Sequence, residues 1–165
     1  MMITLFHGTT LEIQHPLAHV GRADLDFGQG FYLTSIRSQA ERWAQRVQLL
    51  RSADDARLNV YRFDKDYVFS KNHYRTLVFE HYNQEWLEFI VASRRGEEPW
   101  RNYDVIEGGV ANDKVIDTVE DYFSGYITLE QALGALTYTK INHQICLLNQ
   151  ELIDHHLTFC ESILL

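Results

Sequence analysis

The order of hydrophobic and polar positions in the first half of the chain predicts three short strands, "ITLFHGT" (3–9), "GFYLT" (30–34) and "LNVYRF" (58–63). In the first of them, Ile3, Leu5 and His7 share one face, and Gly8 ends the pattern. Residues 10–30 carry a proline and three glycines, so we expect them to be mostly loop.

Hydrophobic residues at helical spacing predict helices elsewhere. Ser38 and Glu41 have the spacing of a capping box, and the helix that they open has a stripe of Ala40, Trp43, Ala44, Val47 and Leu50. A longer helix is predicted across 74–95 with its stop at Gly96, and its stripe consists of Leu77, Val78, Tyr82, Trp86, Phe89 and Ile90.

Two shorter helices follow in the second half. The first ends before Gly125 and carries Val115, Ile116, Val119, Tyr122 and Phe123. Thr128 and Gln131 form a second capping box, which opens a helix with Leu129, Ala132, Leu133 and Leu136. The residues at the C-terminal end of the sequence are also predicted to be helical.

Two strands remain, "YDVIEGG" (103–109) and "HQICLL" (143–148), and the second is predicted to be the final strand. Strands and helices are mixed without regular β-α-β alternation, which predicts the α+β class. A chain of 165 residues is long enough to bury one core, so we expect a single domain across 1–165.

The composition narrows the classes of ligand. Apolar residues make up 45% of the chain and charged residues 23%, as in an ordinary globular protein. The formal net charge of −8 argues against a protein held on nucleic acid by neutralising phosphates. A small anionic ligand held by backbone N–H groups, or a basic protein partner, is compatible with that charge.

Cysteine usage and hydropathy predict a cytoplasmic protein. Cys146 and Cys160 have neither the spacing of metal ligands nor the density of a disulfide scaffold. The beginning, "MMITLFHGTT", lacks the features of a signal peptide, and no stretch approaches the ~20 apolar residues of a membrane span. We therefore expect a reducing compartment and no membrane.

Several common motifs are missing. The sequence has no G-x-S-x-G nucleophile elbow and no G-x-x-x-x-G-K-[ST] phosphate loop. "FGQGF" has two glycines of the dinucleotide fingerprint, but Leu33 stands where the third belongs. No metal site is predicted, because Pro16 separates the spaced pair His15 and His19, and the other histidine pair consists of the adjacent residues His155 and His156.

Two short motifs suggest a ligand site. In "HGT" (7–9) an imidazole stands beside a glycine that lets a ligand approach the main chain, although alone it is better explained as a core histidine. In "FGQGFYLT" (27–34) the two glycines either form a tight turn or leave room for a ligand.

The chain has HGT first, then about twenty residues of loop, and then G-x-G-aromatic-Tyr. In this order the motifs resemble the ADP-ribosyltransferase superfamily. The resemblance is to its His–Tyr branch, which includes the poly(ADP-ribose) polymerases. More narrowly, "DFGQGFYLT", "DVIEGGVAND" and "HQICLL" resemble a bacterial family of uncharacterised small proteins, domain of unknown function 3990, usually classed in that superfamily.

The resemblance implies two small packed sheets around an NAD cleft, with peripheral helices. It implies that His7 hydrogen-bonds the adenine-side ribose, that the Gly8 backbone pairs with the nicotinamide carboxamide and that Tyr32 packs along the nicotinamide ring. Thr9 would help hold the ligand near the end of the first strand. The other cofactor-binding positions would be Gly28, Gly30, Phe31 and Trp43.

The sequence departs from the polymerase branch at two places. Ala40 replaces a serine that commonly bonds the nicotinamide amide, and Trp43 replaces a second stacking tyrosine. Gln144 stands where the superfamily has the glutamate that supports the oxocarbenium ion, while His143 and Glu151 are the other candidates for that role. A neutral amide orients a hydroxyl but does not balance positive charge, which argues against polymer synthesis.

Three smaller questions stay open at this point. Gln144 is alternatively only a polar residue of an edge strand. Asp104 and Asn112 frame "DVIEGGVAND", where they either line the cleft or fix its loop. An Asx turn explains Asn112 equally well.

The function that the resemblance implies is NAD-dependent mono-ADP-ribosyl transfer, with His7, Tyr32 and Gln144 as the catalytic triad and without a metal. The acceptor is a protein, a nucleic acid or a small molecule. The resemblance also implies a toxin or effector neutralised by a small antitoxin protein. Two alternatives are a non-catalytic module that binds NAD or ADP-ribose and a ligand-free protein-interaction domain.

Overall fold

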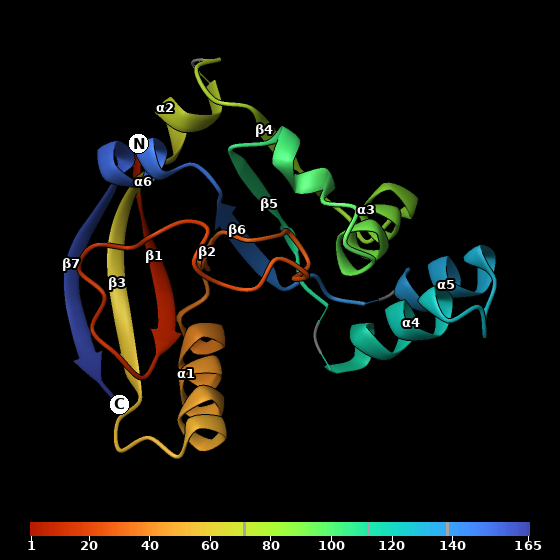
Figure 1. Cartoon of the computed structure of the whole chain (residues 1–165), viewed down its shortest axis with the longest axis horizontal. Helices are drawn as coiled ribbons and strands as arrows, with labels where there is room; N and C mark the ends of the chain where they lie inside the picture. Colours follow the sequence, from red (N-terminus) through yellow and green to blue (C-terminus); the bar gives the residue numbers. More distant parts are fainter. Residues whose placement is uncertain (71, 112, 138) are drawn as a thin grey trace.

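The computed structural model describes residues 1–70, 72–111, 113–137 and 139–165, which form two small β-sheets and six α-helices (Figure 1). One sheet has three strands and is antiparallel throughout. Its strands are, in spatial order, β1 (Met2–Thr9), β3 (Arg57–Asp64) and β7 (Leu157–Leu164).

The second sheet has four strands and joins the first through one bridge. Its strands are, in spatial order, β2 (Phe31–Leu33), β6 (His143–Leu147), β5 (Val105–Gly109) and β4 (Thr76–Val78). β4 and β5 are parallel, and the other pairs are antiparallel. Phe6 of β1 and Thr34, directly after β2, exchange two backbone hydrogen bonds of 2.8 and 3.0 Å. This bridge brings the end of β2 against the edge of β1.

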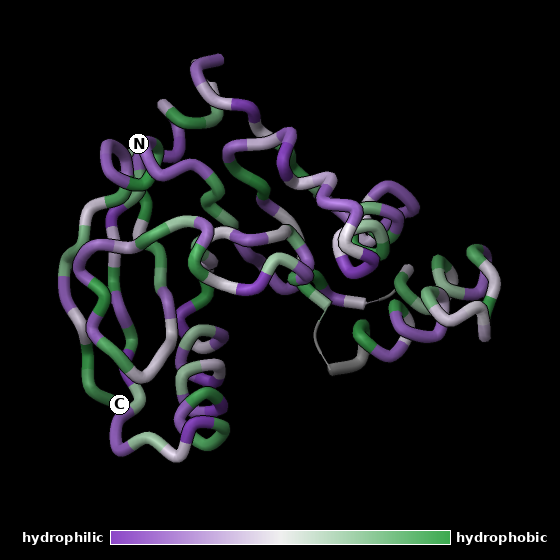
Figure 2. The backbone as a smooth tube through the Cα atoms, viewed as in Figure 1, coloured by the Kyte–Doolittle hydropathy of each residue, from purple (hydrophilic) through white to green (hydrophobic). Residues whose placement is uncertain are grey.

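The helices lie around the sheets. They are α1 (Arg37–Arg51), α2 (Lys65–Ser70), α3 (Gln84–Arg94), α4 (Asp113–Phe123), α5 (Leu129–Leu136) and α6 (Gln150–His156), with a 3-10 turn at Pro99–Asn102. Figure 1 shows α1 beside β1, while α3, α4 and α5 gather at the end of the molecule away from β7. Figure 2 shows hydrophobic and hydrophilic segments alternating along α1, whose buried side consists of Ala40, Ala44 and Val47.

Side chains along the second sheet alternate between two hydrophobic cores, one on each face. Ile145 and Leu147 of β6 face the first sheet and pack in a core that includes Leu5, Phe31, Leu33, Tyr61 and Phe63. Cys146 and Leu148 face the other way and pack in a core that includes Phe27, Trp86, Ile90, Trp100 and Ile106. The second sheet is therefore buried on both faces, which accounts for its hydrophobic sequences.

Most predicted elements are confirmed. The strands predicted at 3–9, 58–63 and 103–109 match β1, β3 and β5 within two residues. The second capping box is present, because the Thr128 hydroxyl accepts from the Gln131 amide and the Gln131 side chain accepts from the Thr128 amide. No helix among the described residues is both long and apolar enough to cross a membrane.

The first capping box is wrong. α1 begins at Arg37, so Ser38 lies inside its first turn, and the N-cap position is Ile36, which has no capping side chain. Instead the Thr34 hydroxyl accepts from the Ile36 amide at 3.1 Å, and Glu41 pairs with Arg37 at 2.7 Å. The bridge between Phe6 and Thr34 fixes where the chain leaves β2, and this tertiary contact overrides the local signal.

The helix predicted across 74–95 is wrong in its first half. Residues 76–78 pair with 105–107 as β4, and α3 starts only at Gln84. Asn83 caps α3, because its side chain accepts from the Trp86 amide at 3.0 Å. The open edge of β5 gives this stretch a strand partner, which helical spacing of apolar residues cannot reveal.

The C-terminal prediction is also only half right. α6 covers 150–156, but residues 157–164 form β7, so "HQICLL" is not the final strand. β7 follows α6 directly and pairs along the free edge of β3. Its exposed positions are mixed in character, so the alternation that marks a strand is weak.

Candidate functional site

His7 and Tyr32 meet at the edge where β1 passes β2. The Nδ1 atom of His7 lies 2.6 Å from the Tyr32 carbonyl oxygen, and the imidazole stacks on Phe31 with ring centroids 4.4 Å apart. A carbonyl only accepts, so Nδ1 carries the proton. Burial lowers the pKa of His7 from its ordinary value near 6.5, although the bond to Tyr32 opposes this. His7 is therefore neutral at pH 7, and its Nε2, to which the described residues give no partner, can accept a hydrogen bond.

Gly8 presents its backbone along the same edge. Phe6 directs its N–H and C=O toward Thr34, and strand alternation directs those of Gly8 to the same side. The described residues give these two groups of Gly8 no backbone partner. The backbone of α1 occupies the space where a side chain of residue 8 would lie, because a Cβ there would be 2.0 Å from the Ala40 carbonyl oxygen. Thr9, the last residue of β1, is buried.

Both glycines of "FGQGF" lie against protein. Gly28 has φ +88°, and a Cβ there would lie 2.1 Å from the Trp100 ring. A Cβ at Gly30 would lie 2.5 Å from the Cys146 sulfur. Close packing and a left-handed turn thus explain both glycines without a ligand.

The Tyr32 hydroxyl is held by the loop that precedes β2. It donates to the Gly28 carbonyl at 2.6 Å and accepts from the Phe27 amide at 3.2 Å. Burial raises the pKa of Tyr32 well above its ordinary value, so the phenol stays protonated. The partly buried ring packs against the core that contains Phe27 and Cys146. Residues 27–28 thus close over the tip of Tyr32.

Gln144 and His143 of β6 occupy opposite faces of the second sheet. Tyr32 pairs with Cys146 and Gly108 pairs with Gln144, so the side chains of Tyr32 and Gln144 share one face. The described residues give the partly buried Gln144 amide no hydrogen-bond partner. His143 faces the first sheet. The structure therefore places His7, Tyr32 and Gln144 on three adjacent strands, β1, β2 and β6, but the His7 imidazole stacks on Phe31, on the face opposite to the side chains of Tyr32 and Gln144.

A family comparison matches almost the whole chain. The model of a family described as "Protein of unknown function (DUF3990)" matches residues 3–159. The chain belongs to this family. No curated protein matches the chain, and no solved structure matches it. The narrow resemblance is thus confirmed, while the link to ADP-ribosyltransferases stays a prediction.

In this DUF3990 chain, Trp43 lies in the middle of α1. Trp43 is 52% exposed and carries the Arg46 guanidinium 5.8 Å above its ring. One turn earlier, the Gln39 side chain donates to the His143 carbonyl at 2.9 Å, which fixes that side of α1 beside β6. Ala40 is buried with Leu58 and Val60 instead of facing a ligand.

The remaining candidates of the DUF3990 chain lie elsewhere. Glu151 is exposed at the start of α6, beyond the end of β6 that is opposite to Gln144. Asp104 is buried and accepts from the Arg75 amide at 2.8 Å and from the Asn149 side chain at 3.1 Å, so it fixes a loop. Asn112 lies outside the described residues.

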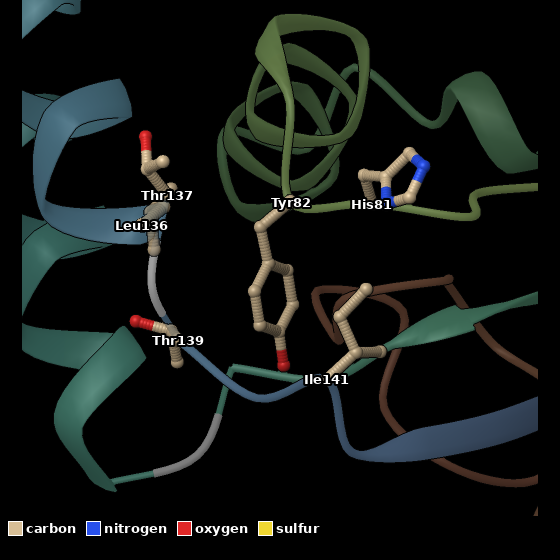
Figure 3. A pocket seen from close by; sticks show the side chains of 6 residues that line it. All are labelled: His81, Tyr82, Leu136, Thr137, Thr139 and Ile141. Carbon is tan, nitrogen blue, oxygen red and sulfur yellow. The ribbon is translucent and has the colours of Figure 1, made fainter.

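Two pockets in the described part of the chain are lined by other residues. One has a volume of about 260 Å³ between the start of α3, the end of α5 and the segment before β6 (Figure 3). Its lining includes His81, Leu136 and Tyr82, whose hydroxyl donates to the Val110 carbonyl at 2.6 Å. The other has a volume of about 380 Å³, and its lining includes Asp26 and Arg94.

Sequence reasoning missed two residues that hold the loop between β1 and β2. Asn59 is buried opposite His7, donates to the Leu11 carbonyl at 2.9 Å and accepts from the Ile13 amide at 3.1 Å. Asp26 accepts from Arg94 at 2.9 Å and from the Ala111 amide at 3.1 Å. A polar residue inside the buried strand pattern at 58–63 was the available signal for Asn59. Asp26 gave no such signal.

Metal ligands do not cluster in the part of the chain that the structure describes. No group of three or more His, Cys, Asp or Glu residues is placed to hold an ion there. His15 and His19 are exposed, and of the two free cysteines Cys146 is buried and Cys160 exposed.

The lowered pKa of His7 predicts a loss of stability in acid. Above pH 6.5 neither state binds the proton, and below it the unfolded chain takes up a proton that the folded chain resists. At about pH 5.5 this costs up to about 1.4 kcal/mol. Urea unfolding of wild type and His7→Gln at about pH 7.5 and about pH 5.5 measures it. We expect the acid loss to shrink in His7→Gln and to persist in the control His15→Gln. An equal loss in all three proteins would contradict the prediction.

Proposed function

We propose that this DUF3990 chain is an NAD-dependent mono-ADP-ribosyltransferase, which cleaves the nicotinamide–ribose bond and transfers one ADP-ribose unit to an acceptor. The observation that carries the proposal is the hydrogen bond of His7 to the Tyr32 carbonyl, beside a Gly8 backbone that has no backbone partner among the described residues and with Gln144 on the adjacent strand β6. These are the positions that the resemblance assigns to NAD, and three strands far apart in sequence bring them together.

His7 and Gly8 offer complementary groups to the dinucleotide. The Nε2 of neutral His7 accepts from a ribose hydroxyl. The N–H and C=O of Gly8, both on the strand edge, match the one acceptor and the donors of the nicotinamide carboxamide. Thr9 is the last residue of this edge, and Phe31 holds the imidazole of His7 in place by stacking on it.

The aromatic wall of the proposed site needs a local movement. Tyr32 packs along the nicotinamide ring only when residues 27–28 release its hydroxyl, and Gly28 and Gly30 let this loop lie close to the strands. Trp43, exposed on α1, supplies the second wall. Held between such walls, the cationic ring and the sugar are positioned for cleavage.

Gln144 sets the reaction type in this proposal. Its amide, which has no hydrogen-bond partner among the described residues, orients a ribose or acceptor hydroxyl but leaves the oxocarbenium charge unbalanced. This supports transfer of a single unit, with slow NAD hydrolysis when no acceptor is bound. By resemblance, the chain acts as a cytoplasmic toxin or effector that a small antitoxin protein neutralises.

Nicotinamide release from NAD by the purified protein tests the proposal. We expect release by wild type, a decrease of about tenfold or more in His7→Ala, and an increase in Gln144→Glu, which restores a carboxylate. His15→Ala, which removes an exposed histidine, is the matched control and keeps the wild-type rate. A wild type that releases no nicotinamide, or a His7→Ala variant as active as His15→Ala, would refute the enzyme.

A non-catalytic NAD or ADP-ribose-binding module is the second candidate, and the Gln144 amide favours it. Such a module releases no nicotinamide, yet NAD at a hundred times its dissociation constant stabilises it by ~2.7 kcal/mol. A rise in melting temperature without release therefore selects the binding module. If NAD causes neither nicotinamide release nor a rise in melting temperature, the protein-interaction domain is selected.

A further inference from the structure

Ser35, His143 and Glu107 form a line of hydrogen bonds on the face of the second sheet that is opposite to Tyr32 and Gln144. The Ser35 hydroxyl lies 3.1 Å from His143 Nδ1, and His143 Nε2 lies 2.9 Å from Glu107 Oε1. Ser35 lies two residues after β2, His143 starts β6 and Glu107 is in the middle of β5. The pairing of β5 with β6, and of β2 with β6, brings these positions together.

The hydrogen-bond pattern assigns a proton to each atom of the line. The Ser35 amide also donates to His143 Nδ1 at 3.3 Å, so Nδ1 is an acceptor. Nε2 then carries the proton and donates it to Glu107. Burial would raise the pKa of Glu107, but the bonds from His143 and from Lys65, at 2.8 Å, hold it below its ordinary value. Glu107 is thus ionised and fixes this tautomer.

Burial is graded along the line from the acid to the hydroxyl. The Glu107 side chain is 12% exposed, that of His143 is 24% exposed, and Ser35 is exposed. The Gln39 side chain donates to the backbone carbonyl of His143 and so holds the backbone of this residue in place. A protected acid, an oriented base and an accessible hydroxyl are the arrangement of an activated nucleophile.

We propose that Ser35, His143 and Glu107 form a nucleophilic triad that hydrolyses small carboxylic esters. The activity needs neither NAD nor the groups of His7, Tyr32 and Gln144, so it goes beyond the transferase and does not rest on it. The missing G-x-S-x-G motif is compatible with it, since a triad is defined by geometry and not by sequence.

Each step follows from the assigned protons. The Ser35 oxygen bonds to the ester carbonyl carbon while its proton passes to His143 Nδ1 and the carbonyl electron pair moves to oxygen. When the tetrahedral intermediate collapses, the bond to the alcohol oxygen breaks, and the leaving alcohol takes the proton from Nδ1. Water repeats this sequence on the acyl-serine and releases the carboxylic acid. The first N–H groups of α1, at Arg37 and Ser38, lack intrahelical partners and lie two and three residues after Ser35, so we expect them to bind the oxyanion.

A fluorophosphonate probe tests the triad, because it phosphonylates activated serines. We expect intact mass to show one adduct on native wild type, peptide mapping to place it on Ser35, and the control Ser124→Ala, which removes an exposed hydroxyl after α4, to label equally. Labelling is lost in Ser35→Ala and falls by about tenfold or more in Glu107→Gln. No adduct on wild type, or an adduct that persists in Ser35→Ala, would overturn the proposal.

A second measurement covers the case in which Glu107→Gln does not fold. The variants Ser35→Cys and Ser38→Cys place a thiol at two exposed positions of the same turn, and only the first lies beside His143. We expect iodoacetamide at neutral pH to alkylate Ser35→Cys several-fold faster, with about tenfold as the upper end. Equal rates in the two variants would show that His143 does not act on position 35.

Discussion

Replacing Gly8 by alanine is expected to lower the free energy of unfolding by about 3 kcal/mol or more. The new Cβ would lie 2.0 Å from the Ala40 carbonyl oxygen and 2.9 Å from the Ala44 amide nitrogen. Both are backbone atoms in the middle of α1, so the helix must shift as a unit away from β1. That shift opens the small core of Ala40, Leu58 and Val60. Urea unfolding followed by circular dichroism measures the loss.

Gly134→Ala is the matched control for this experiment. Gly134 lies within α5. Apart from its chain neighbours and the nearby backbone of this helix, no heavy atom of the described residues lies within 4 Å of an added Cβ. Alanine favours a helix over glycine, so this variant gains up to about 1 kcal/mol. A Gly8→Ala protein as stable as wild type would contradict the close packing of α1 on β1.

Trp86→Ala is expected to cost about 3–5 kcal/mol, as large-to-small changes in a core do. Trp86 is fully buried in the core of α3 and packs on Tyr82 with ring centroids 4.5 Å apart. Its Nε1 donates to the Gly109 carbonyl at the end of β5, at 2.9 Å. The variant therefore loses apolar packing and the only side-chain bond among the described residues to that carbonyl. Urea unfolding measures the cost.

Two variants separate the contributions. Trp86→Phe keeps an aromatic ring but leaves the Gly109 carbonyl without its donor, which costs about 1–3 kcal/mol. Trp43→Ala removes an exposed ring and stays within about 0.5 kcal/mol of wild type. Equal losses in Trp86→Ala and Trp43→Ala would mean that α3 does not bury Trp86 against β5.

The sequence predicted the elements that carry their own pattern. β1, β3 and β5 show an apolar strand pattern, and α5 has a capping box that depends only on neighbours in sequence. Where pairing partners decide, prediction failed. Residues 76–78 join β5 and residues 157–164 join β3, and neither partner is visible from the local spacing of apolar residues.

The same division explains how much of the site was predictable. His7 and Tyr32 could be named from their motifs, and the bridge between Phe6 and Thr34 brings them together. The line from Ser35 through His143 to Glu107 could not be found, because it depends on the register of three strands. The tertiary packing that explains Gly28 and Gly30 was equally hidden.

The strand order of the first sheet has a consequence for synthesis on the ribosome. β3 pairs on one side with β1 and on the other with β7, so its two partners come from opposite ends of the described chain. β1 and β3 can pair once residue 64 has emerged, but the second edge of β3 stays open until residues 157–164 follow. Such long sequence separation slows folding, and an open edge invites pairing with other chains. The nascent chain is therefore exposed to misassociation along this edge until β7 has emerged.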